Sequence, residues 1–538
     1  MASLNQSTVE TDVLIIGAGA SGAVAANYLA AQGLDVLCLE QGDWTDASRF
    51  VGRRPEYEIV ANTRWNPNPN VRLLEQDYPL DVSECAVDPM MYSGVGGSTV
   101  LWSALWHRLL PSDFKVRTLD GAASDWPISY DDLAECYDVI EDALGVSGLA
   151  GDPAYPPRNP YSLAAFPLGP MGLRFAAAMN RLGWHWWPGV NAIPSAPWRN
   201  LNACVRRGVC GFGCADGAKA SVDLTHWPGA LASGARLITG ARVREVTVDG
   251  AGIATGALYV DRAGRDQVAR AQVVVLCANG IGTARLLLLS RSGRFPNGLA
   301  NSSGLVGRGL MLHPTALVTG AVDERMETWL GPMGQIASSL QFYETDRARG
   351  FIRGSKWSLT ASGGPLGYAL AMPSWGAPLH EAMAASFGHT MSLVVFAEDL
   401  PEDHNRVELH ETLTDSDGIP APKIYYRIGQ NTGRIIDFNL QRAAEALTEA
   451  GSARTFATPV RREFGGAHLM GTARMGLDPS TSVVNQWGRS HDVPNLYVFD
   501  GSVFVTGGAV NPTATICALA LRFARRLAES RRHQKVAA

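Results

Sequence analysis

A single histidine in a glycine-rich stretch could do acid–base chemistry. Residues 465–476 read GGAHLMGTARMG, and in this stretch His468 has no cysteine, carboxylate or second histidine beside it. A neutral imidazole, with a reference pKa of about 6.5, can accept a proton from a hydroxyl group near neutral pH. His468 could equally be a buried structural residue held by hydrogen bonds. The stretch alone leaves both interpretations open.

Three cysteines close together in the chain could bind an iron–sulfur cluster. The segment NACVRRGVCGFGCADGAKAS contains Cys204, Cys210 and Cys214, and thiolates are the usual ligands of such clusters. The alternative is a glycine-rich loop whose cysteines are structural or form a disulfide. We expect the other five cysteines to be buried small hydrophobic residues: Cys38, Cys85, Cys136, Cys277 and Cys517.

The elements that would position such groups begin with a strand, a glycine-rich turn, a helix and a second strand. Residues 11–41 read TDVLIIGAGASGAVAANYLAAQGLDVLCLEQ, and DVLIIG and LDVLCLE are aliphatic runs typical of buried parallel strands. The Ala-rich segment between them predicts a helix that ends at Gly33. Gly17 permits the tight turn, Gly19 lets backbone approach a pyrophosphate, and Gly22 lets the helix pack on the strand.

An acidic residue, Glu40, closes the second strand. At this place a carboxylate accepts hydrogen bonds from ribose hydroxyls, and the preceding helix N-terminus supplies partial positive charge to the phosphates. An acid here argues against a 2′-phosphate. The segment therefore predicts dinucleotide binding and leaves FAD and NAD open.

Two later segments have less specific patterns. YSGVGGSTVLWS at 92–103 is a glycine-rich turn of a kind that many proteins contain. Near the C-terminus, NLYVFD predicts a strand, residues 501–510 a loop, and the sequence from Asn511 and Pro512 a long buried helix.

Composition narrows the class of protein. The 538 residues are 46% hydrophobic and 18% charged, which suits a large globular chain with two or more domains. The net charge of −5 gives no basic field for a phosphate backbone, so we expect no nucleic-acid partner. Apolar runs are too short to cross a bilayer, so we expect no transmembrane segment.

Taken together, the motifs resemble the glucose-methanol-choline (GMC) family of FAD-dependent oxidoreductases. The resemblance rests on GAGASG, GVGGST, ANGIGTARLLLLS at 278–290, HLMGTARMG and DGSVF with GGAVNPTATI, in the family's order. A narrower likeness, to bacterial gluconate, fructose and sorbitol dehydrogenases, rests on GVGGSTVLW, DWPISYDDL and GAVNPTATI.

The resemblance implies an α/β fold with two domains. A Rossmann-like FAD-binding domain is expected from residues 8–160, 228–315 and 460–535. An α+β substrate-binding domain with a large antiparallel sheet is expected from residues 161–227 and 316–459.

The resemblance also assigns roles to residues. It places His468 at the family's catalytic base and Asn511 at its partner, which can hold an alcohol oxygen but cannot act as the base. Asn511 could instead cap the helix that follows it. The cofactor contacts that it implies are Gly17, Gly19, Gly22, Glu40, Gly96, Gly97, Ser98, Asp500, Pro512 and Thr513.

Some family members attach FAD through a histidine that precedes the Trp of the motif matched here by GGSTVLW. This chain has Leu101 there, next to Trp102, and His107 lies outside the motif. We therefore expect dissociable FAD. Certain sugar dehydrogenases of the branch carry a three-iron cluster near a segment like the three-cysteine loop, whereas many relatives keep such loops without one, so a cluster is the less favoured alternative.

Other aromatic residues and histidines are ambiguous. Trp184, Trp186, Trp187 and Trp198 are clustered, and such residues form a core more often than a wall for a sugar or aryl group. His313 and His491 match no base position, so we expect both to be structural.

The sequence thus predicts oxidation of a CH–OH group of a sugar, glycoside or polyol by hydride transfer to FAD, with His468 as general base. One alternative is oxidation of an aryl or other bulky alcohol with oxygen as acceptor. Others are a flavin-dependent lyase and a flavin-binding protein without redox turnover, against which His468 and Asn511 argue. The acceptor is a quinone, a cytochrome, another carrier or oxygen, and the branch likeness favours a dehydrogenase.

The N-terminal sequence bears on location. MASLNQSTVETDVLIIG has no basic region followed by an apolar stretch and no twin arginine. A cytoplasmic location is therefore the default expectation, and export together with a partner subunit stays open.

Overall fold

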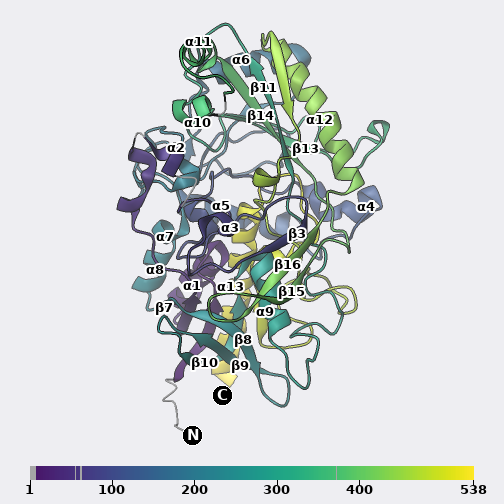
Figure 1. The fold of residues 1–538 in the computed structure, drawn as a ribbon. Coiled ribbons are helices and arrows are strands. Elements are labelled where there is room, and N and C mark those ends of the chain that lie inside the picture. The colour runs from purple at the N-terminus through teal and green to yellow at the C-terminus, as the bar shows by residue number, and fades with distance from the viewer. Residues whose placement is uncertain (1–7, 55, 61–63, 371, 538) are drawn as a thin grey trace.

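The seven-stranded sheet at the lower end of the molecule contains the predicted strand–turn–helix–strand unit (Figure 1). The computed structural model describes residues 8–54, 56–60, 64–370 and 372–537. Strands β1 (Thr8–Ile16) and β2 (Val36–Glu40) pair in parallel, and helix α1 (Ala20–Ala31) connects them. Gly33 follows the helix with φ 78°, a backbone conformation that favours glycine. The unit expected from residues 11–41 is therefore present.

Distant parts of the chain complete this sheet. Its strand order is β7-β2-β1-β10-β9-β8, and β18 pairs in parallel with β10. Helix α13 packs against α1 and α5, and its small buried residues allow that close approach. The added elements are β7 (Arg236–Thr239), β8 (Arg242–Val248), β9 (Ala254–Val260), β10 (Asp266–Leu276), β18 (Leu496–Val498), α5 (Asp131–Leu144) and α13 (Thr513–Ala537).

A six-stranded sheet lies in the upper part of the molecule (Figure 1), in the order β17-β11-β14-β13-β12-β6, and its pairings are antiparallel. Helix α12 packs on one face of this sheet together with α6, over a core of Met, Trp, Leu and Ala side chains. Its elements are β6 (Trp187–Pro188), β11 (Thr315–Ala321), β12 (Ala337–Ser339), β13 (Ser355–Thr360), β14 (Thr390–Ala397), β17 (Arg454–Thr458), α6 (Gly169–Leu182) and α12 (Gln430–Glu449).

Smaller elements connect the two sheets. Two short sheets are β15 (Arg406–Thr414) with β16 (Pro420–Tyr426) and β3 (Asp81–Cys85), and β4 (Ser147–Gly148) with β5 (Leu163–Ala164). The ANGIGTARLLLLS motif forms helix α9, which follows β10. The remaining helices are α2 (Tyr57–Val60), α3 (Pro69–Arg72), α4 (Val116–Asp120), α7 (Val222–Thr225), α8 (Trp227–Ala232), α9 (Asn279–Leu289), α10 (Pro365–Leu370) and α11 (Ala377–Ser386).

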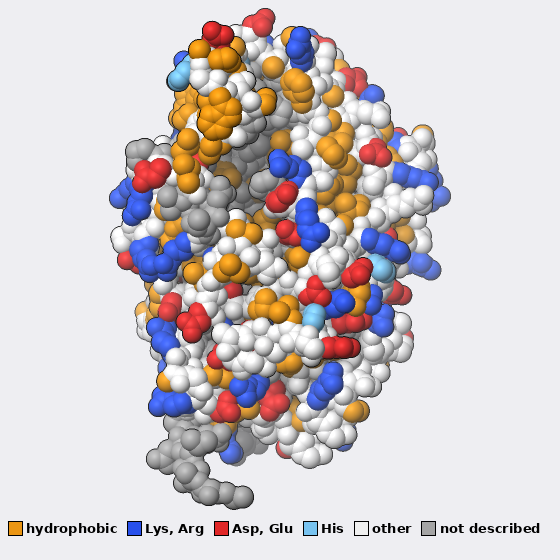
Figure 2. Space-filling view, viewed as in Figure 1, with side chains coloured by type: hydrophobic (Ala, Val, Ile, Leu, Met, Phe, Trp, Pro, Cys, Tyr) orange, Lys and Arg blue, Asp and Glu red, His pale blue; other side chains and the backbone are white. Residues whose placement is uncertain are grey.

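The expected combination of a mainly parallel sheet and a large antiparallel sheet is confirmed. The domain boundaries remain a prediction. Figure 2 shows basic and acidic side chains interspersed over one face of the molecule, in keeping with the small net charge, and apolar side chains gathered over α10 and α11. Within the described part of the chain, no helix is long and apolar enough to cross a membrane.

Candidate active site

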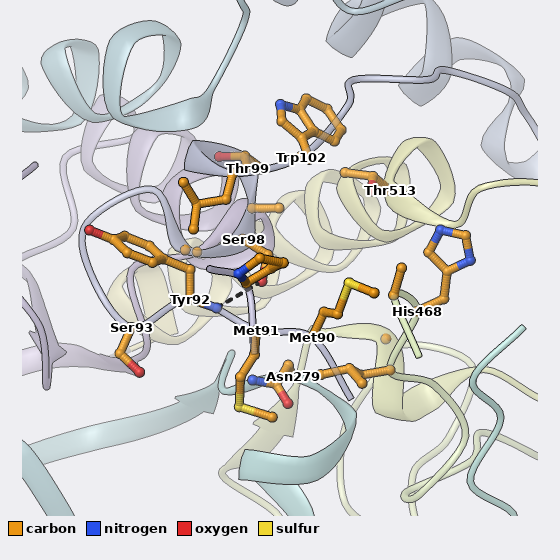
Figure 3. Close-up of a pocket in the computed structure, with 18 of the residues that line it drawn as sticks. Met90, Met91, Tyr92, Ser93, Ser98, Thr99, Trp102, Asn279, His468 and Thr513 are labelled. Atoms are coloured by element: carbon orange, nitrogen blue, oxygen red, sulfur yellow. Dashed lines mark hydrogen bonds between the residues drawn. The ribbon is translucent and has the colours of Figure 1, made fainter. Parts of the chain in front are cut away.

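One cavity of about 920 Å³ extends from the glycine-rich first turn to His468. Gly17, Gly19 and Glu40 line one part of it, and His468 and Asn511 line another. Figure 3 shows His468 and Thr513 facing the space on one side, with Tyr92 and Ser98 on the other. The structure therefore brings the predicted dinucleotide turn and the candidate base to the same cavity.

The first turn has the geometry that a pyrophosphate site needs. A Cβ at Gly17 would lie 2.5 Å from the carbonyl oxygen of Cys277, and one at Gly22 would lie 2.0 Å from that of Gly17. Gly19 precedes α1 and offers no side chain to cap it, so the first N–H groups of the helix are available to a ligand. A Cβ at Gly97 would lie 2.8 Å from the Cα of Gly19, so the GVGGST turn contacts this site.

Two predicted cofactor residues are buried carboxylates bound to the surrounding chain. Glu40 accepts hydrogen bonds from the backbone N–H of Ala18 and of Gly42, each at 2.9 Å, and burial raises its pKa to about 7. Asp500 accepts from Ser502 N at 2.9 Å and from the Thr283 hydroxyl at 2.5 Å. Both line the cavity, and each carboxylate retains lone pairs for a ligand.

His468 has a polar neighbour at each ring nitrogen. Its Nε2 lies 3.2 Å from Asn511 Nδ2, and its Nδ1 lies 2.9 Å from His313 Nδ1. Phe396 stacks beside the ring with a centroid distance of 6.2 Å. Burial lowers the pKa of His468 well below 6.5, and His313 and Lys356 lower it further. The ring is therefore neutral at physiological pH, which is the form a general base needs.

Two residues at this site were missed by sequence reasoning. His313, expected to be structural, is buried and contacts His468 from the loop before β11. Lys356 of β13 is fully buried and donates to Asn511 Oδ1 at 2.6 Å. Only a weak sequence pattern pointed to Lys356. It lies in the strand SKWSLT, in which every second side chain faces the same side of the sheet.

The Asn511 side chain contacts Lys356 and His468, so it is engaged away from helix α13. The first carbonyl to accept a helical bond is that of Pro512, from Ile516 N at 2.9 Å. Helix α13 begins at Thr513, directly after the Asn511 and Pro512 start that the sequence predicted. These contacts do not support the capping interpretation of Asn511, and its substrate-facing role stays a prediction.

Two consecutive acidic residues after β14 hold the loops that carry His313 and Asn511. Glu398 accepts from Gly508 N at 3.0 Å. Asp399 accepts from Leu312 N at 2.8 Å and from His313 N at 3.3 Å, and Tyr426 OH donates to it at 2.8 Å. Burial raises the pKa of Asp399 to about 6. The end of one strand thus positions both neighbours of His468.

Comparison with known proteins gives the family. The GMC oxidoreductase family model matches an N-terminal part, residues 11–315, and a C-terminal part, residues 401–520. The chain belongs to the GMC oxidoreductase family. It is an enzyme of the class that oxidises CH–OH donors, and its substrate is an alcohol or sugar-like compound.

Relatives of this GMC oxidoreductase match along nearly their full length. It is 40% identical to 2-methyl-1,2-propanediol dehydrogenase of Mycolicibacterium austroafricanum, over 96% of this chain and 95% of the relative. It is 30% identical to the fructose dehydrogenase large subunit of Gluconobacter japonicus, over 97% of this chain and 98% of that relative. The solved structure of pyridoxine 4-oxidase from Mesorbium loti has the same fold, with a TM-score of 0.64 and 19% identity. The match covers 96% of this chain and 99% of that one.

GMC oxidoreductases bind FAD, and the cavity of this one fits that cofactor. The uncapped N-terminus of α1 suits the pyrophosphate, and Glu40 lies at the same end of the cavity. Leu101, rather than a histidine, precedes Trp102 at the cavity wall. His107 is engaged elsewhere, with its Nε2 2.6 Å from Gln335 Nε2.

The three-cysteine loop of this GMC oxidoreductase packs around a buried lysine. Lys219 Nζ donates to the carbonyls of Val100, Trp102 and Cys210 at 2.7, 3.2 and 2.6 Å. Among the described residues, no group of three or more His, Cys, Asp or Glu side chains is arranged to hold a metal ion. The iron–sulfur cluster stays an alternative prediction, and the other five cysteines are buried as expected.

The tryptophan cluster of this GMC oxidoreductase has structural contacts. Trp184 packs edge-on against Phe342 and Trp357, and Trp198 Nε1 donates to the Asp142 carbonyl at 2.8 Å. Among the described residues that line the cavity, Trp102 is the tryptophan. These contacts favour the packing interpretation of the cluster. His491 bonds to the Ser482 hydroxyl at 2.9 Å, as a structural residue would.

Proposed function

We propose that this GMC oxidoreductase oxidises a CH–OH group of an uncharged diol, polyol or sugar, with His468 as the general base. The observation that carries the proposal is the 3.2 Å separation of His468 Nε2 and Asn511 Nδ2 at the wall of the cavity. An alcohol oxygen that lies in the cavity within hydrogen-bond reach of both nitrogens can donate its proton to Nε2 and accept a hydrogen bond from Nδ2.

The oxidation needs an acceptor for two electrons. FAD held in the cavity would supply this acceptor, because a flavin can take the hydrogen of the carbinol carbon as hydride. The hydroxyl proton passes to His468 Nε2, and the C–O bond becomes a carbonyl. Asn511 holds the oxygen while its charge develops.

The part of the cavity wall that the antiparallel sheet contributes supports an uncharged substrate. The antiparallel sheet contributes hydroxyl groups from Thr315, Ser358 and Thr360 and apolar surface from Val394 and Phe396. This mixture suits a small molecule with both hydroxyl and alkyl groups. The relative at 40% identity is named for a branched diol, which has this composition. We therefore rank diols and polyols first and sugars second.

The acceptor and the mode of FAD attachment are also proposals. Two relatives with high coverage are named as dehydrogenases, which favours a carrier such as a quinone or cytochrome over oxygen. Leu101 beside Trp102 supports dissociable FAD.

An anaerobic substrate screen tests the proposed function. Purified enzyme with FAD is mixed with 2-methyl-1,2-propanediol, 1,2-propanediol, D-fructose, D-gluconate or benzyl alcohol, and bleaching of the flavin absorbance is followed. We expect bleaching by a diol. Fast bleaching by benzyl alcohol alone, followed by rapid recovery on admission of oxygen, would identify an aryl-alcohol oxidase. Conversion of substrate without bleaching or added acceptor would identify a lyase.

A further inference from the structure

A buried lysine lies directly behind the candidate catalytic pair. In β13 the side chains of Lys356, Ser358 and Thr360 alternate with those of Trp357 and Leu359. The latter two are buried in the core of the antiparallel sheet. Ser358 and Thr360 line the cavity, and Lys356 on the same side of the strand is fully buried against Asn511.

The contacts of Lys356 are with neutral groups. Its Nζ donates to Asn511 Oδ1 at 2.6 Å and lies 4.4 Å from the ring centroid of Phe396. Burying an amine costs free energy, and one hydrogen bond with a cation–π contact offsets that cost only in part. Burial accordingly lowers the pKa of Lys356 well below its usual range. A lysine in such a place is explained more readily by its effect on Asn511 than by stability.

The lysine determines which way the Asn511 amide faces. Its Nζ donates to the amide oxygen at 2.6 Å, which places that oxygen on the lysine side. The amide NH₂ then faces His468 Nε2, at 3.2 Å. Because that NH₂ only donates, Nε2 must be the unprotonated nitrogen of the ring. The ring proton is then on Nδ1, where it donates to His313 Nδ1 at 2.9 Å.

We propose that Lys356 is a positioning residue that fixes the Asn511 amide and thereby keeps His468 Nε2 unprotonated, so that it can accept the proton of the substrate hydroxyl. The inference rests on the proposed function, since it assigns a task to the base named there. It concerns a residue that does not itself line the cavity. Without Lys356 the amide can rotate, and its oxygen then favours a protonated Nε2, which cannot act as a base.

The groups that face His468 come from several elements. His313 approaches from the loop before β11, Lys356 from β13 and Asn511 from the start of α13. Asp399 and Glu398 bind the backbone of the two loops. Loss of the Lys356 charge raises the pKa of His468, because that charge is one of the influences that lower it.

The first test is Lys356→Met, which keeps the length and apolar stem of the side chain and removes the donor. Anaerobic stopped-flow experiments measure the limiting rate of flavin reduction and the substrate Kd. We expect the limiting rate to fall about tenfold or more at neutral pH, part of the roughly 100-fold that a positioned base contributes. Substrate Kd and FAD content should change little, and the acid limb of the rate should move to higher pH.

A double-mutant cycle separates positioning from a general structural role. If Lys356 acts through the Asn511 amide, then Lys356→Met in an Asn511→Ala background changes the rate by no more than about twofold. Lys219→Met is the matched control, since Lys219 is also a buried lysine but donates to backbone carbonyls away from His468. It should affect the thermal midpoint and FAD content without moving the pH profile of the reaction.

A measurement without substrate keeps this proposal distinct from the proposed function. In protein labelled with ¹⁵N-histidine, His468→Ala identifies the His468 signals. In the wild type we expect an unprotonated Nε2 and a protonated Nδ1, and in Lys356→Met a protonated Nε2 in part of the population. This outcome supports the positioning role even if no tested alcohol bleaches the flavin.

Three results would overturn the inference. The first is a protonated Nε2 in the wild type at neutral pH. The second is a Lys356→Met enzyme that reduces FAD at the wild-type rate, and the third is independent effects of the two substitutions in the cycle. If Lys356→Met fails to fold, two other variants replace it. Lys356→Gln retains an N–H donor on a shorter side chain, and Asn511→Asp removes the donor to Nε2. Wild-type reduction rates in Asn511→Asp would then contradict the orientation argued here.

Discussion

His468 is surrounded by groups that disfavour a second proton, and with it a positive charge, on its ring. Burial is the largest influence on its pKa, and His313 and Lys356 act in the same direction. The buried His313 shows the same effect, with a pKa lowered to about 3. A neutral, fixed imidazole at a cavity wall is suited to receive a proton and unsuited to carry a permanent charge.

The direct prediction at residue scale is that His468→Ala loses the base. We expect flavin reduction by substrate to slow by about 100-fold or more, because general-base catalysis typically contributes that much. FAD should remain bound, since the phosphate end of the cavity is unchanged. His491→Ala is the control, because His491 bonds to Ser482 and not to the cavity groups. Reduction at the wild-type rate in His468→Ala would remove His468 from the mechanism.

The pH dependence of flavin reduction follows from the direction in which the pKa of His468 is shifted. A histidine whose pKa is lowered stays unprotonated as the pH falls through 6.5, the ordinary value. The limiting rate of flavin reduction should therefore be constant from about pH 8 to below pH 6.5 and fall only in more acidic buffer. Stopped-flow measurement across this range checks it. A decline centred at or above pH 6.5 would show that the base is not held in this environment.

Sequence patterns identified some site residues and missed others. His468, Asn511 and Glu40 were named because their motifs resemble those of a family and because each has a chemical role that its side chain can fill. His313 and Lys356 were missed because their neighbours in the chain are apolar or small, and only the partners that folding brings within 3 Å distinguish them from core residues.

At the scale of elements, the end of β14 holds the site together. Asp399 binds the loop that carries His313, and Glu398 binds the loop that leads to Asn511. Tyr343 reinforces the second loop, since its hydroxyl accepts from Ala509 N at 3.0 Å and donates to Asp113 at 2.9 Å. The two loops are far apart in the sequence, and their hydrogen bonds to adjacent residues at the end of β14 hold them close to each other.

We therefore predict that Asp399→Ala lowers both stability and activity. Removing a buried acceptor leaves Leu312 N and the Tyr426 hydroxyl without a partner, at a cost of about 1–3 kcal/mol for each group. The thermal midpoint should fall by several degrees, and flavin reduction should slow because His313 is no longer held. Asp403→Ala, at an exposed position nearby, is the control. Equal midpoints and rates in both variants would contradict this role for Asp399.

At the scale of the whole molecule, the cavity is shared by elements from both sheets. β1 contributes Ile16, β11 contributes Thr315 and the start of α13 contributes Thr513. A ligand that fills such a cavity binds the folded state and not the unfolded one, so it raises stability by mass action. FAD bound in this cavity would therefore help to hold the two sheets together.

Removal of FAD should be reversible and should destabilise the chain. We expect acid precipitation to leave a colourless protein pellet and free FAD, because Leu101 offers no atom for a covalent bond. Protein stripped of FAD under mild conditions should unfold at a lower temperature, and FAD at about 100 times its Kd should restore about 2.7 kcal/mol. Calorimetry with increasing FAD measures the shift. A yellow pellet, or a midpoint independent of FAD, would contradict the prediction.

The sequence by itself determined the local elements and the family. Alternating strand and helix patterns, with glycine where φ or close approach demands it, predicted the β1–α1–β2 unit, because these preferences depend on neighbours in the chain. The motifs predicted the cofactor and the candidate base. Tertiary structure decided which groups surround that base, since His313, Lys356 and Asn511 come from three separate elements. Hydrogen bonds at such sequence separations depend on how the sheets pack, and that packing determines which groups contact the two ring nitrogens of His468.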